Sequence, residues 1–411
     1  IELCLVGSEM CIRDSVITEA QAKRCSQHKV SFRKVNQKRI LYDQQWRAGD
    51  TIRNPLLAKT LERIKTHGRD GFYKGKTADL IVNKVQNLGG IITKEDLENY
   101  NVKWREPIIF NYNSHKIISM PPPSSGGICL AQILKTIEPF NIGQYKHNSK
   151  KYIQLIVEAE RRSYADRSYF LGDPDFVDIP TESLISTKYL SQRMKSFNWN
   201  KATKSSDLTR GSLLGFESDE TTHYSIVDHY GNSVSVTTTL NGAYGSKVFV
   251  DKGGFFLNNE MDDFSSKPGT PNMFGLIGAE ANSIAPKKRM LSSMSPTIIE
   301  TNGQLKMVLG SPGGSTIITT VLQNILNILH YNMTMQESVS EPRFHHQWLP
   351  DNIKFEPSFD TVVFGPLKKL GYKIDNSNFQ VIGKTDAILV LPDGRLEGGA
   401  DPRGDDKAEG F

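Results

Sequence analysis

The chain has 411 residues, of which 38% are hydrophobic and 23% are charged, and its formal net charge is +5 at pH 7. This composition is typical of an ordinary globular protein, long enough for a large core or two domains. The basic residues are mostly scattered, and no run approaches the roughly 18 apolar residues needed to span a bilayer. We therefore expect neither a nucleic-acid partner nor a membrane span.

The first part of the chain carries little structural signal. Residues 1–15 look like a foreign leader joined to a truncated chain, and residues 16–50 are polar with little periodicity, which predicts irregular structure. Of the four cysteines, Cys25 and Cys129 lie outside the leader and have no CxxC spacing. We expect no disulfide framework and no cysteine-bound metal.

Helical periodicity dominates the next part of the chain. Apolar residues recur at helical spacing over 55–69, 77–87, 128–137 and 150–167. A short helix is expected after Thr93, which with Glu95 and Asp96 has an N-cap signature. Strands are expected within 108–120. Residues 190–215 are rich in lysine and serine, which predicts a flexible, exposed segment.

Strand signals take over after residue 220. Two β-rich runs, 223–228 and 233–239, flank a turn at 230–232, and further strands are expected at 253–257, 297–299 and 306–309. A core helix is predicted at 315–329, and a closing hairpin at 386–397. Strands between helices without strict alternation favour a layered α/β architecture.

The segment 217–225 contains the pair Thr221 and Thr222 just before a β-rich run. A threonine hydroxyl is a weak nucleophile unless a base lies next to it. If the chain were cut before Thr221, the new α-amino group, with a pKa of about 7.7–8.0, would supply that base on the same residue. Taken alone, the segment is more typical of a plain Thr-Thr pair entering a strand.

Further segments accompany Thr221 in a specific order. They read TTHYS at 221–225, TTTLN at 237–241, LNNEMDDFS at 257–265, LSSMSPT at 291–297 and GSPGGS at 310–315. Upstream lie GIITKEDL at 90–97, MPPPSSGG at 120–127, YADRS at 164–168 and GDPD at 172–175. This series resembles the γ-glutamyltranspeptidase family of N-terminal-nucleophile hydrolases, from about residue 45 to the C-terminus. The resemblance implies an α/β fold, a four-layer αββα sandwich.

The resemblance also implies that the chain cuts itself between Glu220 and Thr221. Residues 16–220 would be the C-terminal part of a large subunit, and residues 221–411 a small subunit of 411 − 220 = 191 residues. Thr221 would drive the cleavage and then act as the catalytic nucleophile, while Thr239 would hydrogen-bond its hydroxyl. Without the family, Thr239 is an ordinary strand residue.

Gly313 and Gly314 match the pair whose backbone N–H groups form the oxyanion hole in the family. Glycine allows close approach of the backbone, and one such donor stabilises a transition state by about 2.7–4 kcal/mol. A tight turn is the plain alternative. A phosphate-binding loop would require the pattern GxxxxGK[ST], which is absent.

Substrate-binding residues follow from the same resemblance. Asn241, Glu260 and Asp263 match positions that hold an α-ammonium group, and Ser292 and Ser293 match serines that hold the α-carboxylate. Charge-assisted hydrogen bonds of this kind are strong. In the family an arginine from the N-terminal part of the large subunit assists the serines, and we expect that region to be missing here.

Five other residues are interpreted with the family in view. Phe274 matches the lid loop, where many bacterial members carry a tyrosine, so that one gate hydrogen bond would be lost. His345 and His346 point to opposite sides of a strand and cannot chelate together, so we expect structural roles. The Asp262–Asp263 pair has no further ligand at suitable spacing, so neither a metal nor another cofactor is expected.

The resemblance implies a γ-glutamyltranspeptidase and glutathione hydrolase. It would transfer the γ-glutamyl group of glutathione and related compounds to water or to amino-acid or peptide acceptors. The large and small subunits would form a heterodimer from one precursor, located in the periplasm or secreted. Two alternatives stay open: a cephalosporin-type acylase or poly-γ-glutamate-cleaving relative, and an inactive, unprocessed fragment.

Overall fold

The computed structural model describes residues 15–208, 221–265, 267, 270, 278–375 and 381–410. The chain forms two compact units, which do not follow chain order. Unit 1 comprises Ile1–Trp104 and Ala243–Asn259, and unit 2 comprises Arg105–Gly242 and Glu260–Phe411. Every predicted site residue belongs to the ranges of unit 2, although Glu220 and Phe274 lie outside the described residues.

Unit 1 is mainly helical. Its helices are α2 (Glu19–Asn36), α3 (Pro55–His67), α4 (Asp70–Tyr73), α5 (Gly75–Asn87) and α6 (Lys94–Asn99). Its two-stranded sheets pair β1 (Ser15–Val16) with β2 (Thr51–Ile52), and β7 (Phe249–Val250) with β8 (Phe255–Phe256). A small aromatic core forms around Phe32, Ile40 and Phe249.

Helix α2 overturns the prediction of irregular structure for residues 16–50. Its apolar periodicity is weak, and few of its side chains are buried. Its start is nevertheless marked in the sequence, because Thr18 accepts the backbone N–H of Gln21 and the side chain of Gln21 accepts the N–H of Thr18. This reciprocal pair is a capping box, which stabilises the first turn where hydrophobic patterning does not.

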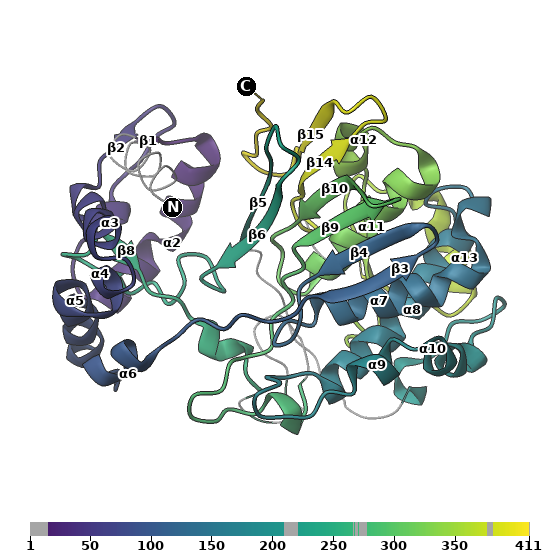
Figure 1. Cartoon of the computed structure of the whole chain (residues 1–411), viewed down its shortest axis with the longest axis horizontal. Coiled ribbons are helices and arrows are strands. Elements are labelled where there is room, and N and C mark those ends of the chain that lie inside the picture. The colour runs from purple at the N-terminus through teal and green to yellow at the C-terminus, as the bar shows by residue number, and fades with distance from the viewer. Residues whose placement is uncertain are drawn as a thin grey trace. The chain divides into compact units, whose positions relative to one another are not determined.

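Unit 2 is built on a six-stranded antiparallel sheet in the order β15-β14-β10-β9-β4-β3 (Figure 1). The strands are β3 (Ile108–Tyr112), β4 (His115–Ser119), β9 (Thr297–Thr301), β10 (Gln304–Gly310), β14 (Asp386–Val390) and β15 (Leu396–Ala400). Two of them precede residue 221 and four follow it. The sheet is therefore shared by the two halves that cleavage at Thr221 would create.

Helices and a hairpin cover this sheet. The helices α7 (Gly126–Ile137), α8 (Lys150–Phe170) and α11 (Thr316–Tyr331) supply most of the core, and α7 and α11 contact the sheet directly. The hairpin of β5 (Thr221–Val227) and β6 (Ser233–Thr239) contacts β9 and β10. Met307 and Val308 of β10 point to opposite faces, and both are fully buried, so both faces of the sheet are covered. Helices, sheet and hairpin form successive layers, and the predicted α/β class is confirmed.

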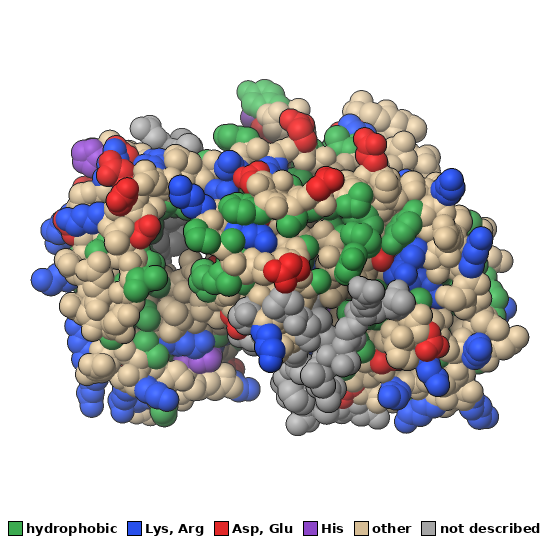
Figure 2. All heavy atoms as spheres, turned by 90° about the horizontal axis from the view of Figure 1, so that it is seen from below, with side chains coloured by type: hydrophobic (Ala, Val, Ile, Leu, Met, Phe, Trp, Pro, Cys, Tyr) green, Lys and Arg blue, Asp and Glu red, His purple; other side chains and the backbone are tan. Residues whose placement is uncertain are grey.

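The remaining elements of unit 2 are short. They are α9 (Thr181–Leu184), α10 (Thr187–Arg193), α12 (Met335–Ser340), α13 (Phe364–Lys369) and a small sheet of β11 (Phe344–His345), β12 (Ile353–Phe355) and β13 (Ile374–Asp375). Within the described ranges, no helix has the length and apolarity needed to cross a bilayer. On the face shown in Figure 2, Lys and Arg side chains are interspersed with Asp and Glu.

The predicted flexible segment at 190–215 is only partly described, and its described part is ordered. Leu190 is buried on α10, and Ser205 is buried in a 3-10 turn, Ser205–Asp207. Ser205 donates its hydroxyl to the carbonyl of Trp348 at 2.5 Å, and its backbone N–H donates to Asp351 at 2.9 Å. Many side chains of 190–208 are exposed, as predicted, but a polar composition does not reveal the long-range partners of Ser205.

Candidate active site

Thr221 and Thr239 lie opposite each other in the β5–β6 hairpin. The hydroxyl of Thr221 donates to Oγ1 of Thr239 across 3.3 Å, and the same Oγ1 accepts the backbone N–H of Asn241 at 2.8 Å. Asn241 has a positive φ of 71°, a conformation that asparagine tolerates better than most residues. The chain therefore turns directly after β6, and Asn241 lies beside the threonine pair.

These residues line a cavity together with others that the sequence predicted. The predicted residues among its walls are Thr221, Thr239, Asn241, Asp263, Ser292, Ser293 and Gly314. The cavity measures about 20 Å³ in the continuous chain, which is room for a water-sized group. A larger ligand would therefore require the cavity to open.

Gly313 and Gly314 connect the end of β10 to the start of α11. Gly313 has φ 134° and Gly314 has φ 54°. A β-carbon on Gly313 would lie 2.6 Å from Oγ1 of Thr316, so the turn requires glycine there. The carbonyl of Gly313 accepts both the N–H and the hydroxyl of Thr316, at 2.9 and 2.7 Å. The glycine pair thus lies at the N-terminus of a 16-residue helix, an environment that favours negative charge.

The acidic residues lie in one 3-10 turn, Glu260–Asp263. Burial raises the pKa of Glu260 to about 7. Burial also raises the pKa of Asp263 well above its usual range, the nearby Glu260 raises it further, and the charge of Arg167 opposes the change. A bound cation would favour the ionised form of both carboxyl groups, so this turn is chemically suited to an ammonium ligand.

The two serines are held by a segment from the first half of the chain. The backbone N–H of Ser292 donates to the carbonyl of Pro123 at 2.9 Å, and both the N–H and the hydroxyl of Ser125 donate to the carbonyl of Ser292, at 2.8 and 2.7 Å. The segment 120–127 therefore fixes the backbone from which Ser293 projects.

Arg167 is a site residue that the sequence did not single out. It is buried, and it donates from Nε to Oγ of Ser125 at 2.9 Å and from Nη2 to Oγ of Ser293 at 3.1 Å. It also lines the cavity, as do Leu291, Met294 and Ile317. The sequence signal was an arginine within the family segment 164–168, near the end of a long, buried helix. Its distance from Ser293 along the chain concealed the contact.

The two adjacent histidines lie away from the cavity walls and are buried. His345 bonds to Thr319 at 2.9 Å and to Gln347 at 2.8 Å, and burial lowers its pKa to about 3. Nε2 of His346 lies 3.3 Å from Oδ1 of Asp351. Among the residues that the structure describes, no three His, Cys, Asp or Glu side chains gather in a way that could hold a metal ion.

A larger cavity of about 540 Å³ occurs elsewhere in unit 2. Its walls combine apolar residues with a few polar ones: Glu106, Ile108, Pro121, Pro122, Pro174, Phe176, Val177, Asp178, Ile179 and Thr181. It lacks the convergence of a strand-end threonine, buried carboxyl groups and a buried arginine. We therefore place the candidate active site at the smaller cavity.

The fold and the site define an α/β protein in which helices and a β-hairpin cover a central sheet, with Thr221 at the start of that hairpin. A solved structure of cephalosporin acylase from Bacillus halodurans has a similar fold, with a TM-score of 0.79 over 97% of this chain and 72% of that chain. The sequence identity is 23%, so this likeness concerns the fold alone.

The chain belongs to the gamma-glutamyltranspeptidase family, which matches residues 9–411. The glutathione hydrolase proenzyme of Escherichia coli is 47% identical over 364 residues, covering 88% of this chain and 62% of that protein. The glutathione hydrolase proenzyme of Pseudomonas aeruginosa is 43% identical over 369 residues, covering 88% and 65%. The chain thus spans less than two thirds of either relative. The resemblance noted in the sequence is confirmed, and the family match begins at residue 9, earlier than the expected start near residue 45.

Proposed function

We propose that this chain cuts itself between Glu220 and Thr221 and then transfers γ-glutamyl groups through an ester on Thr221. The donors would be glutathione and related γ-glutamyl compounds, and the acceptors would be water, amino acids or peptides. The names of the curated relatives, glutathione hydrolase proenzymes, support both the reaction and the processing.

One observation carries the proposal. The hydroxyl of Thr221, at the start of a strand, shares one cavity with Asp263 of the acidic turn and with Ser292 and Ser293. The buried Arg167 donates a hydrogen bond to Ser293. An α-amino acid end needs a negative partner for its ammonium group and hydrogen-bond donors for its carboxylate. Asp263, Glu260 and Asn241 would bind the ammonium group, and Ser292 and Ser293 would bind the carboxylate.

The chemistry requires no group beyond the chain and water. In cleavage, the Thr221 hydroxyl attacks the Glu220 carbonyl, the peptide C–N bond breaks, and an ester with a free α-amine forms; water then hydrolyses the ester. In turnover, the α-amine takes the proton of the hydroxyl, which attacks the γ-carbonyl; the amide C–N bond breaks and the leaving amine receives that proton. Water or an acceptor amine then attacks the ester carbonyl, its C–O bond to Thr221 breaks, and the threonine hydroxyl regains a proton. Gly313 and Gly314 would donate N–H groups to the oxyanion, and Thr239 would orient the hydroxyl.

The remaining assignments belong to the same proposal. Residues 16–220 and 221–411 would form the two chains of a heterodimer. Phe274 would cover the site as part of a lid. Export to the periplasm or the medium is proposed from the family.

Intact mass and N-terminal sequencing of the purified protein test the processing. We expect two chains, the smaller beginning Thr-Thr-His-Tyr and containing 191 residues (411 − 220). Release of p-nitroaniline from γ-glutamyl-p-nitroanilide tests the transfer. A single uncut chain that does not turn over this substrate would overturn the proposal and favour an inactive fragment.

A cephalosporin-type acylase is the second candidate, because a relative named Acylase ACY 1 proenzyme, from Pseudomonas sp. (strain SE83), is 35% identical over 349 residues. Acylase substrates of the glutaryl type lack the α-ammonium group. The acidic turn favours γ-glutamyl donors, since burial leaves its carboxyl groups without full solvation. Faster turnover of glutaryl-p-nitroanilide than of γ-glutamyl-p-nitroanilide would establish the acylase instead.

A further inference from the structure

Asn282 joins two segments that contribute walls to the cavity. Its side chain is buried, at 4% exposure, in the 3-10 turn Glu280–Asn282. Nδ2 donates to the carbonyl of Asp263 at 2.7 Å, and Oδ1 accepts the backbone N–H of Leu291 at 2.9 Å. One amide therefore bridges the acidic turn and the residue that directly precedes Ser292 and Ser293.

The chemistry of the partners determines the orientation of this amide. A backbone carbonyl can only accept and a backbone N–H can only donate, so the NH₂ group must face Asp263 and the oxygen must face Leu291. The backbone of the same residue is also engaged, because its carbonyl accepts the N–H of Ser265 at 2.9 Å and its N–H donates to the carbonyl of Ala279 at 3.2 Å. Four hydrogen bonds therefore fix the side chain and the backbone of Asn282 in this structure.

We propose that Asn282 is a positioning residue that sets the separation between the ammonium-binding and carboxylate-binding sides of the cavity. This inference rests on the proposed function, because it concerns how an α-amino acid end is recognised. The ammonium and carboxylate groups of such a ligand are attached to one carbon, so their separation is invariant. Groups that bind both must be held at a matching distance, and a shift of either segment would weaken binding of the pair.

Asn282 therefore acts on selectivity. A γ-glutamyl donor uses both sides of the cavity, whereas a glutaryl compound uses only the carboxylate side. Loss of the bridge lets the acidic turn move relative to the serines, and the ligand that needs both sides is penalised more. The expected signature is a fall in the preference for γ-glutamyl over glutaryl compounds, with little change in the rate at saturation.

The test substitutes Asn282→Asp, which keeps the shape and the acceptor for Leu291 and removes the donor to Asp263. We expect KM for γ-glutamyl-p-nitroanilide to rise about tenfold, the effect of one buried hydrogen bond, while kcat changes less than about twofold. The ratio of kcat/KM for the γ-glutamyl and glutaryl anilides should fall by a similar factor. An equal loss of kcat/KM with both substrates, which leaves their ratio unchanged, would overturn the inference.

Asn327→Asp is the matched control. Asn327 is also buried and also bridges two segments, since Nδ2 donates to the carbonyl of Ser338 at 3.2 Å and Oδ1 lies 2.9 Å from Nε2 of His147. It does not line the cavity. This variant should lower Tm and leave the substrate ratio unchanged. If Asn282→Asp does not fold, Asn282→Ser, which keeps a small hydrogen-bonding group, is measured in its place.

Calorimetric binding of L-glutamate and glutarate separates this inference from the proposed function. A wild-type chain without turnover of γ-glutamyl-p-nitroanilide would end the proposed function. The Asn282 inference would then be decided by binding: wild type should prefer L-glutamate, and Asn282→Asp should lose about tenfold of that preference. Equal preference in both proteins, or none in wild type, would overturn the inference.

Discussion

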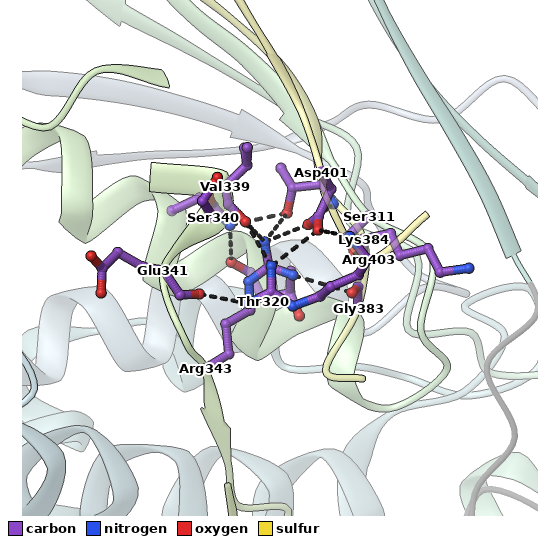
Figure 3. Close-up of polar contacts among 12 residues, drawn as sticks. Ser311, Thr320, Val339, Ser340, Glu341, Arg343, Gly383, Lys384, Asp401 and Arg403 are labelled. Carbon is purple, nitrogen blue, oxygen red and sulfur yellow. Dashed lines mark hydrogen bonds and ion pairs between the residues drawn. The ribbon is translucent and has the colours of Figure 1, made fainter. Parts of the chain in front are cut away.

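Two buried groups of charged residues in unit 2 differ in the direction in which the fold shifts the pKa of their carboxyl groups. The arginine cluster consists of Arg343, Arg403, Glu356 and Asp401. Figure 3 shows three of these residues, Arg343, Arg403 and Asp401. Arg343 donates to Oδ2 of Asp401 at 2.6 Å, and Arg403 donates to Oδ1 at 3.0 Å. Burial would raise the pKa of Asp401, but the two arginines outweigh it, and the pKa falls below its usual value.

The acidic turn at the cavity shows the reverse. Burial raises the pKa of Glu260 and Asp263, and the charge of Arg167 does not compensate. In the arginine cluster the fold itself balances the charge of the carboxylate, whereas at the acidic turn burial disfavours the ionised form and a cationic ligand would restore it. The predictions below test both sides of this difference.

The largest expected effect comes from Thr221→Ala. Without the hydroxyl neither the cleavage nor the transfer has a nucleophile, so both should fall at least about 10⁴-fold. Mass spectrometry measures the cleavage, and anilide hydrolysis measures the transfer. Thr222→Ala is the control, because Thr222 is exposed and points away from Thr221 along the strand. Surviving activity in Thr221→Ala would move the nucleophile elsewhere.

Asp401→Asn should destabilise the fold by about 3–5 kcal/mol, because it leaves Arg343 buried without its carboxylate. Since the pKa of Asp401 is lowered in the fold, its contribution is present above its ordinary value near 3.8 and is lost as pH falls through the lowered folded value. Urea unfolding at pH 7 measures the loss. Arg395→Ala is the control, since its ion pair with Asp393 is exposed and its loss should leave the urea midpoint nearly unchanged.

Glu260→Gln should change the free energy of unfolding in the opposite direction to Asp401→Asn. The folded pKa, about 7, lies above the ordinary value of 4.5, so the ionised carboxyl costs stability as pH rises from about 4.5 through 7. At pH 8 the variant should be more stable by about 1–3 kcal/mol, and the gain should vanish near pH 4. It should also bind γ-glutamyl donors more weakly. A variant that is less stable at pH 8 would remove the contrast with Asp401.

Thr239→Val should give the smallest effect. It removes the acceptor for the Thr221 hydroxyl and for the N–H of Asn241 while preserving side-chain shape. We expect kcat for γ-glutamyl-p-nitroanilide to fall about tenfold, the magnitude of one hydrogen bond. Thr238→Val, at the exposed neighbouring position, should change kcat less than about twofold. Equal rates in the two variants would show that Thr239 does not orient the nucleophile.

Local signals in the sequence predicted local structure well. The core helix expected at 315–329 is α11, and the closing hairpin expected at 386–397 is formed by β14 and β15, because apolar periodicity and turn chemistry act over a few residues. The sequence did not predict helix α2, because its apolar pattern is weak and the capping box at Thr18 is its main signal. The family motifs identified seven of the residues that share the cavity.

The rest depended on contacts between distant parts of the chain. Arg167 and Ser293 are 126 residues apart, and Asn282 acts through the backbone of Asp263 and Leu291. No local pattern encodes such distances, since they follow from the packing of α8 beside the segments around the cavity. The arginine cluster was missed for the same reason, although Arg343 and Arg403 were visible in the sequence as isolated basic residues.

The shared sheet has a consequence for the order of events in the life of the chain. Strand β4 comes from before residue 221 and β9 from after it, and they pair along five residues, with Ile117 and Ile299 opposite each other and fully buried. Either half made separately would present a bare, apolar strand edge, a template for aggregation. If the chain is cut at Thr221, the peptide bond before it is needed to hold the two halves together only until β4 and β9 have paired. Halves produced from two separate genes should therefore precipitate unless they meet during synthesis.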